Sequence, residues 1–179
     1  AEKDPSRPVL TRAVVVLHRG KVVAERYAPG INRNTPLLGW SMTKSVTNAM
    51  IGLLVKDGKL KVSAPAPIKE WKNDERAAIT LDNLLRMSSG LDFEENYGKV
   101  SDATNMLFRV PNAGQYAIQS PLKAKPGTEW YYSSGTTNIL QELIRRQFKN
   151  LPAYLAFPHQ RLFQKLGMST AIMEPDPSG

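Results

Sequence analysis

A serine and a lysine three residues apart form the pair in this chain best suited to nucleophilic chemistry. The pair is Ser41 and Lys44, near the start of a segment, Leu37 to Gly58, whose apolar residues recur at helical spacing. The two side chains should share one helix face, one turn apart. A serine hydroxyl becomes a nucleophile when a base in contact takes its proton, and a neutral lysine amine can be that base.

The setting of this pair favours chemistry over an ordinary surface lysine. A helix N-terminus places backbone N–H groups and the positive end of the helix dipole at the serine. The same dipole, with burial against an apolar helix, disfavours an ammonium on Lys44 and so favours the neutral amine. The alternative stays open: a lysine whose stem lies along apolar surface while its head reaches water.

A tyrosine later in the chain stands where a third catalytic group could lie. Tyr132 opens the run Tyr132-Ser133-Ser134-Gly135, at the point where an extended segment turns into a helix. A tyrosine at such a corner is either a packing anchor or, where a cation lowers its pKa, a proton relay.

The sequence lacks the residues that other classes of catalytic site require. The chain has no cysteine, which excludes disulfides, thiolate catalysis and thiolate metal sites. Its two histidines, His18 and His159, belong to no G-x-S-x-G or H-E-x-x-H pattern, and we interpret both as structural or exposed. No phosphate-binding glycine loop is present. The sequence therefore predicts no metal site and no cofactor.

Composition indicates an ordinary globular protein with a basic surface. The 179 residues carry a net charge of +8, but the basic residues are scattered and form no stripe with interleaved aromatics, so we expect no nucleic-acid binding. No apolar run reaches membrane-spanning length, and no signal peptide is present. The start, AEKDPSRP, fits the remainder of a cleaved export signal or a chain boundary. The compartment stays unknown, with an exported or periplasmic location slightly favoured over a cytoplasmic one.

The N-terminal quarter predicts a mobile lead-in and a hairpin. Residues 1–10 are expected to form the lead-in, because 1–8 are polar and contain two prolines. Within 11–30, two β-branched runs flank Arg19-Gly20, which predicts a β-hairpin. The unbroken valines of the first run predict burial on both faces. Loop residues then lead to the helix of 37–58, and 1–179 is expected to form a single domain.

Residues 59–173 predict a mainly helical region. Thr80 is a candidate N-cap for a short helix ending at Gly90, and a second helix is expected near Asp102 to Arg109. A strong amphipathic helix carries Ile139, Leu140, Leu143, Ile144 and Phe148 on one side. The last helix should open at Pro152, break at Pro158 and be capped by Gly167.

Four segments resemble the serine β-lactamase and penicillin-binding-protein-like hydrolases. SMTKS at Ser41 to Ser45 matches the S-x-x-K motif of that family. LLRMSSGLDF at Leu84 to Phe93 is similar to L-L-x-H-x-S-G-L, with methionine in place of histidine. PGTEWYYSSG, which begins at Pro126, is similar to P-G-x-x-F-x-Y-S-N, and LFQKLGM at Leu162 to Met168 is similar to L-F-x-P-L-G-M.

A finer resemblance is to the nylon-oligomer (6-aminohexanoate-dimer) hydrolases and related carboxylesterases, within the class C-related side of the family. Ser134 stands where class C β-lactamases carry asparagine, which argues weakly against β-lactamase activity. Tyr97, in FEENY, would correspond to a tyrosine that touches the substrate amide, although an ordinary loop aromatic is as good an interpretation. The resemblance thus implies Tyr97 and Ser134 as substrate-binding residues.

The resemblance implies an α/β (α+β) fold, with the hairpin belonging to a central antiparallel sheet beside a mainly helical region. The family's third motif, K/H-x-G, lies on a later sheet strand that nothing after Met173 can supply. We therefore expect this chain to be an N-terminal part that a C-terminal segment completes, with the isolated chain of doubtful activity.

The family resemblance implies the activity of a serine hydrolase that cleaves a small amide or ester through an acyl-enzyme. In such an enzyme Ser41 is the nucleophile, Lys44 the base and Tyr132 the proton relay. A non-catalytic binding or sensor module, and β-lactamase or DD-peptidase activity, remain alternatives.

Overall fold

The computed structural model describes Ser6 and residues 9–179, so most of the lead-in predicted for 1–10 lies outside the described residues. Contacts divide the chain into two compact units, 1–38 and 39–179. Each unit is described by itself, and the single domain expected over 1–179 stays a prediction.

The first unit contains the predicted hairpin. Strands β1 (Ala13–His18) and β2 (Lys21–Tyr27) pair antiparallel, with a register shift between Val16 and Leu17. Arg19 and Gly20 both have positive φ, 49° and 75°. Two-residue hairpin turns with positive φ at both positions match the twist of the strands they join, so the turn explains the hairpin.

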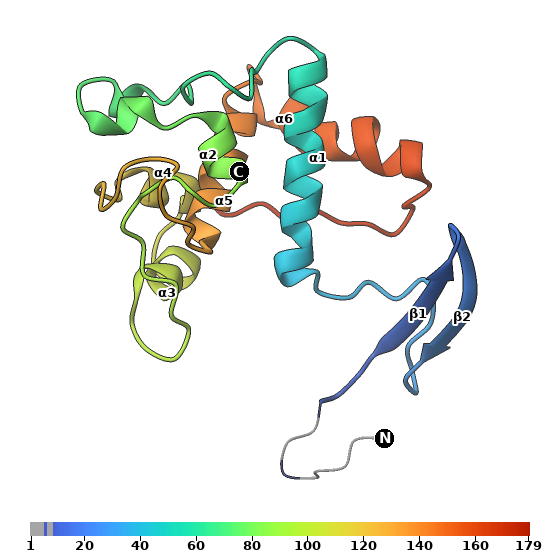
Figure 1. The fold of residues 1–179 in the computed structure, drawn as a ribbon. Coiled ribbons are helices and arrows are strands. Elements are labelled where there is room, and N and C mark those ends of the chain that lie inside the picture. Colours follow the sequence, from blue (N-terminus) through green and yellow to red (C-terminus); the bar gives the residue numbers. More distant parts are fainter. Residues whose placement is uncertain (1–5, 7–8) are drawn as a thin grey trace. The chain divides into compact units, whose positions relative to one another are not determined.

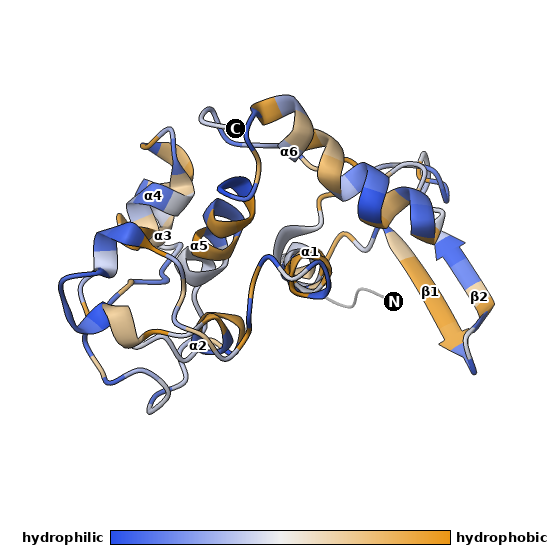
Figure 2. Ribbon diagram, turned by 90° about the horizontal axis from the view of Figure 1, so that it is seen from above, coloured by the Kyte–Doolittle hydropathy of each residue, from blue (hydrophilic) through white to orange (hydrophobic). Residues whose placement is uncertain are grey.

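The predicted burial of the first strand is wrong. Val14, Val15 and Val16 are 46–50% exposed, although Figure 2 shows β1 as largely hydrophobic. The sheet of the described residues has two strands, so each strand has one neighbour and its unit supplies no layer to cover either face. Continuous valines therefore do not by themselves predict what covers a strand.

The second unit, 39–179, is built from helices (Figure 1). Six are α-helices: α1 (Thr43–Lys56), α2 (Leu81–Leu85), α3 (Asp102–Phe108), α4 (Ala113–Ile118), α5 (Ser134–Arg145) and α6 (Leu151–Pro158). Five short turns complete it in the described residues: 3₁₀ turns η1 (Trp40–Met42), η2 (Lys69–Trp71), η3 (Glu75–Ala78) and η5 (Gln164–Leu166), and a π turn, η4 (His159–Phe163).

Helix α5 is the centre of this unit. It contacts α1, α2, α3, α4 and α6, and its buried side is the predicted apolar face, with Ile139, Leu140, Leu143 and Ile144 almost fully buried. Thr47 of α1 also accepts a hydrogen bond from Gln141 Nε2 at 2.8 Å. This bond fixes the first half of α1, where the Ser-Lys pair lies, against α5.

The ends of the helices follow the sequence signals only in part. Thr80 caps α2 through a capping box with Asn83, as predicted, but α2 ends at Leu85 and not at Gly90. Met87 has a φ of +57°, a left-handed conformation that an α-helix cannot contain. Helix α4 was not predicted; its N-cap is Asn112, whose side chain accepts from the backbone N–H of Gln115.

An ion pair joins the far end of α5 to η2 and gives a stability prediction. Arg146 donates two hydrogen bonds to the Glu70 carboxylate, at 2.8 and 3.1 Å, and these lower the pKa of Glu70 from 4.5 to about 2. A depressed folded-state pKa contributes stability that is present above the unfolded pKa and lost as pH falls toward the folded one.

Glu70→Gln should therefore lower the free energy of unfolding at pH 7 by about 1 kcal/mol, and the difference from the wild type should shrink between about pH 4.5 and 2. Urea unfolding at pH 7 and pH 3 measures both values. Exposed Glu75 supplies the control, Glu75→Gln. A deficit of Glu70→Gln that is equal at both pH values would contradict the assignment of the effect to this ion pair.

Candidate active site

Ser41 lies in η1, the short turn that runs directly into α1. The residue before it, Trp40, has a φ of +42°, so the chain enters this turn through a strained backbone conformation. Ser41 itself is exposed, and its Oγ accepts hydrogen bonds from Lys44 Nζ at 3.2 Å and from the Tyr132 hydroxyl at 2.5 Å. The serine is thus held by one group a helical turn away, Lys44, and by one 91 residues further along the sequence, Tyr132.

Lys44 is half-buried in the first turn of α1 and is shared between two serines. Its Nζ donates to Ser41 Oγ and to Ser134 Oγ, both at 3.2 Å, and lies 4.8 Å from the centre of the Tyr132 ring. The Lys44 side chain therefore points into the site. The alternative, a lysine whose charged head extends into water, does not describe it.

Tyr132 faces the pair from the other side. The lysine beside it and the hydrogen bond to Ser41 lower the pKa of its hydroxyl, while burial opposes the shift. Tyr131 points elsewhere: its hydroxyl accepts from the backbone N–H of Glu95 at 3.1 Å. Adjacent side chains of an extended segment point to opposite sides, so the structure places the predicted tyrosine, and not its neighbour, at the serine.

Two loops running side by side hold Tyr132 in place. Residues 87–92 pair with 121–131 through backbone bonds, including Tyr131 N–H to the Met87 carbonyl at 2.9 Å. Gly90, with a φ of +77°, makes this approach possible: a Cβ there would lie 2.1 Å from the Ala124 carbonyl oxygen. The S-G-L segment is therefore the support on which the tyrosine-bearing loop rests.

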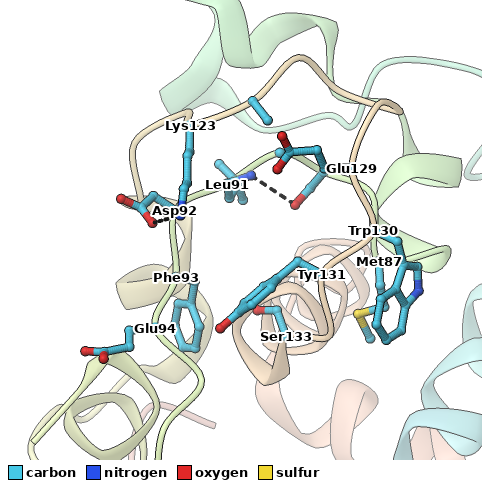
Figure 3. A pocket seen from close by; sticks show the side chains of 13 residues that line it. Met87, Leu91, Asp92, Phe93, Glu94, Lys123, Glu129, Trp130, Tyr131 and Ser133 are labelled. Carbon is cyan, nitrogen blue, oxygen red and sulfur yellow. Dashed lines mark hydrogen bonds and ion pairs between the residues drawn. The ribbon is translucent and has the colours of Figure 1, made fainter.

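These loops also enclose a cavity of about 200 Å³, shown in Figure 3. Its wall includes Met87, Phe93, Trp130, Tyr131 and Ser133. Ser41, Lys44 and Tyr132 do not line it. The cavity lies on the Tyr131 side of the extended segment and is separate from the Ser-Lys-Tyr cluster.

Ser134 and Tyr97, expected at the substrate, meet at the edge of this cluster. Their hydroxyls lie 3.2 Å apart, and Ser134 also receives the hydrogen bond from Lys44. Tyr97 is 55% exposed and donates to Glu95 Oε1 at 2.6 Å. The structure thus brings all five sequence-predicted residues into one network, while their chemical roles stay predictions.

Glu95 is the member of the site that sequence reasoning missed. Its second carboxylate oxygen accepts from the backbone N–H of Ser134 at 2.8 Å, the first residue of α5. Carboxylates are favoured at helix N-termini, where free N–H groups point outward. The only sequence signal was its position in FEENY, two residues before Tyr97.

The two histidines belong to elements other than those that carry this network. His18 ends β1 and His159 begins η4, and the hydrogen bonds of Ser41 in the described residues come from Lys44 and Tyr132. Among residues 6 and 9–179, no group of three or more histidine, aspartate or glutamate side chains is placed to hold a metal ion. No helix of this described part is long and apolar enough to cross a membrane.

Comparisons with known proteins agree on one family. The Beta-lactamase family model matches residues 6–179. A curated 6-aminohexanoate-dimer hydrolase from Paenarthrobacter ureafaciens is 25% identical over 150 residues, which cover 76% of this chain and 38% of that protein. A solved structure titled "Putative 6-aminohexanoate-dimer hydrolase from Bacillus anthracis" is similar with a TM-score of 0.60 and 28% identity, over 75% of this chain and 39% of that one. The chain therefore spans about two fifths of the length of these relatives.

Proposed function

The chain belongs to the beta-lactamase family, and on this premise we propose that it carries the catalytic residues of a serine hydrolase that cleaves a small amide or ester. The observation that carries the proposal is the contact of Ser41 Oγ with both Lys44 Nζ and the Tyr132 hydroxyl. A serine nucleophile needs a base in contact and a third group that orients or relays, and these two contacts supply them.

Acylation uses each group once. Ser41 Oγ attacks the carbonyl carbon of the substrate, and its proton passes to Lys44 Nζ in the neutral amine form. The Ser41 backbone N–H donates to the developing oxyanion. Tyr132 gives a proton to the leaving nitrogen or oxygen as the bond to the carbonyl carbon breaks, which leaves an ester on Ser41.

Deacylation reverses the roles. Tyr132, whose hydroxyl has a lowered pKa because of Lys44 and Ser41, takes a proton from the attacking water. The bond between the carbonyl carbon and Ser41 Oγ then breaks, Lys44 returns to this oxygen the proton that it took during acylation, and the acid product leaves. No step requires a metal or an organic cofactor.

The relatives and the rim of the site support a substrate class for this proposal. The curated relative is named 6-aminohexanoate-dimer hydrolase and the solved structure carries the same name with the word "putative", which supports a linear amide as substrate. Ser134 places its hydroxyl beside Lys44 and Tyr97 places its hydroxyl beside that of Ser134, where both are suited to contact the substrate amide. We expect esters to be accepted as well, because the same attack and relay serve both bonds.

Turnover assays test this function. The protein expressed from its complete reading frame should hydrolyse p-nitrophenyl butyrate and the 6-aminohexanoate dimer, and should hydrolyse the β-lactam nitrocefin more slowly. A sensor module would instead bind or retain an acyl group without turnover. Absence of turnover on all three substrates by folded protein would contradict the proposal.

Tyr132→Phe tests the relay. Removing the hydroxyl should lower kcat by roughly 10²–10³-fold, because both leaving-group protonation and water activation lose their proton carrier. Tyr116→Phe is the matched control, since the Tyr116 hydroxyl bonds Asp102 outside this site. Stopped-flow release of p-nitrophenol measures both variants; wild-type turnover by Tyr132→Phe would remove Tyr132 from the mechanism.

A further inference from the structure

Resting on the proposed function, we propose that Glu95 is a positioning residue that orients Lys44 and stabilises its ammonium form through two hydroxyls, those of Ser134 and Tyr97. In a Ser-His-Asp triad a carboxylate does this for the histidine directly. Here the carboxylate would act on a lysine base through a chain of hydrogen bonds. The contacts that form this chain are all within the 39–179 unit.

Four residues make up this chain of hydrogen bonds. Lys44 Nζ lies 3.2 Å from Ser134 Oγ, which lies 3.2 Å from the Tyr97 hydroxyl, which lies 2.6 Å from Glu95 Oε1. The other carboxylate oxygen, Oε2, accepts from the Ser134 backbone N–H at 2.8 Å. Glu95 therefore holds both the last hydroxyl of the chain and the backbone that carries the first.

The direction of every bond in the chain follows from the donors available. An ammonium and a carboxylate fix the two ends, because the first can only donate and the second only accept. Tyr97 has one hydroxyl proton and gives it to Glu95, so it must accept from Ser134. Ser134 in turn accepts from Lys44. All three bonds point from the lysine to the carboxylate.

This orientation has a chemical consequence during acylation. Lys44 gains a proton and a positive charge when Ser41 attacks, and aligned hydroxyl dipoles ending on a carboxylate stabilise a positive charge at their start. Three tyrosines of the described residues interact with Glu95: Tyr97, Tyr131 through the Glu95 backbone N–H, and Tyr132. The negative charge of Glu95 opposes the lowering of the Tyr132 pKa by Lys44. The electric field of Glu95 therefore reaches the catalytic groups.

Local packing holds Glu95 in position. The 93–97 segment lies against the start of α5 because Gly135 has no side chain: a Cβ there would meet the buried Phe93 ring at 2.6 Å. Tyr131 pins the Glu95 backbone from the loop that also carries Tyr132. Contacts with the loop that carries Tyr131 and with the start of α5 therefore hold the Glu95 carboxylate in position.

The test is the pH dependence of kcat/KM for p-nitrophenyl butyrate in Glu95→Gln. We expect kcat/KM to fall roughly 10- to 100-fold, the size of one unit charge acting within a protein. We also expect the acid limb of the profile to move to lower pH, because the catalytic cluster loses a negative charge that favours its protonated form. A merely structural role would lower the plateau and leave the limb in place.

Two further variants complete the experiment. Glu94→Gln is the matched control, since the Glu94 side chain pairs with Lys99 at the surface and makes no described hydrogen bond to Lys44, Ser134, Tyr97 or Glu95. Tyr97→Phe breaks the hydrogen-bond chain at its middle. It should move the acid limb of the pH profile in the same direction as Glu95→Gln. Adding Glu95→Gln to Tyr97→Phe should then move the limb by less than Glu95→Gln does alone, because the hydroxyl path is already broken and only the Oε2 contact with the Ser134 N–H and the charge remain to be lost.

The outcomes separate this inference from the proposed function. Wild-type turnover that Ser41→Ala abolishes supports the function, whatever Glu95 does. An unmoved acid limb in Glu95→Gln, or in Tyr97→Phe if Glu95→Gln does not fold, would overturn the role of Glu95. Absence of wild-type turnover would overturn both.

Discussion

Ser41→Ala should abolish acylation and reduce turnover by roughly 10⁴-fold or more while leaving the fold unchanged. The size of the effect reflects the loss of the nucleophile itself, which no neighbouring group replaces. The fold should survive because Ser41 is exposed and caps no helix. Release of p-nitrophenol from p-nitrophenyl butyrate measures the loss, and circular dichroism checks the helices.

The matched control for Ser41→Ala is Ser45→Ala. Ser45 is an exposed serine one helical turn further along α1, and no hydrogen bond among those described joins its side chain to the site. Its variant should retain wild-type activity. If Ser41→Ala and Ser45→Ala had equal activities, the nucleophile would be misassigned.

Lys44→Ala should be nearly as damaging, with kcat/KM reduced by roughly 10³-fold or more, since it removes the base and the charge that lowers the pKa of Tyr132. Within the 39–179 unit, His159 makes no described hydrogen bond with Ser41, whose partners are Lys44 and Tyr132. Lys44→Arg separates the two effects, because arginine keeps the charge and cannot act as a base at neutral pH. Lys56→Ala, in the last turn of the same helix, is the control. Turnover close to wild type in Lys44→Ala would overturn the assigned base.

The parts of the fold that the sequence predicted are those set by local signals. The hairpin follows from two β-branched runs around Arg19-Gly20, and α1 ends just before Gly58, which has a φ of +73°. The family and fold class predicted from four motifs are confirmed by the Beta-lactamase match and by the similar solved structure. Motifs spaced through the whole chain constrain a fold far more than any single one.

The parts that were missed depend on distant partners. Glu95 meets Ser134 across 39 residues of sequence, and a carboxylate in a polar loop gives no sign of the helix end that it will cap. The end of α2 was misplaced because Met87 takes a left-handed conformation that its side chain does not favour. The burial of β1 depends on whatever covers a sheet face, which the valines themselves do not encode.

The site shows the same division. The spacing of Ser41 and Lys44 on one helix turn predicted their contact, and the resemblance predicted that Tyr132 would join them. The hydrogen-bonded chain from Lys44 to Glu95 has no counterpart in periodicity or spacing, because it forms only where two loops and two helices meet. Short motifs therefore predict the reacting groups better than the groups that orient them.

The central claim is that Ser41 forms a transient acyl-enzyme, and intact-mass spectrometry after rapid mixing with p-nitrophenyl butyrate tests it most directly. We predict a species heavier by one butyryl group that appears within the first turnover, maps to the peptide containing Ser41, and disappears as substrate is consumed. The same species should persist in Tyr132→Phe and be absent from Ser41→Ala. A butyryl group found on another residue, or p-nitrophenol release with no adduct in either the wild type or Tyr132→Phe, would contradict the account.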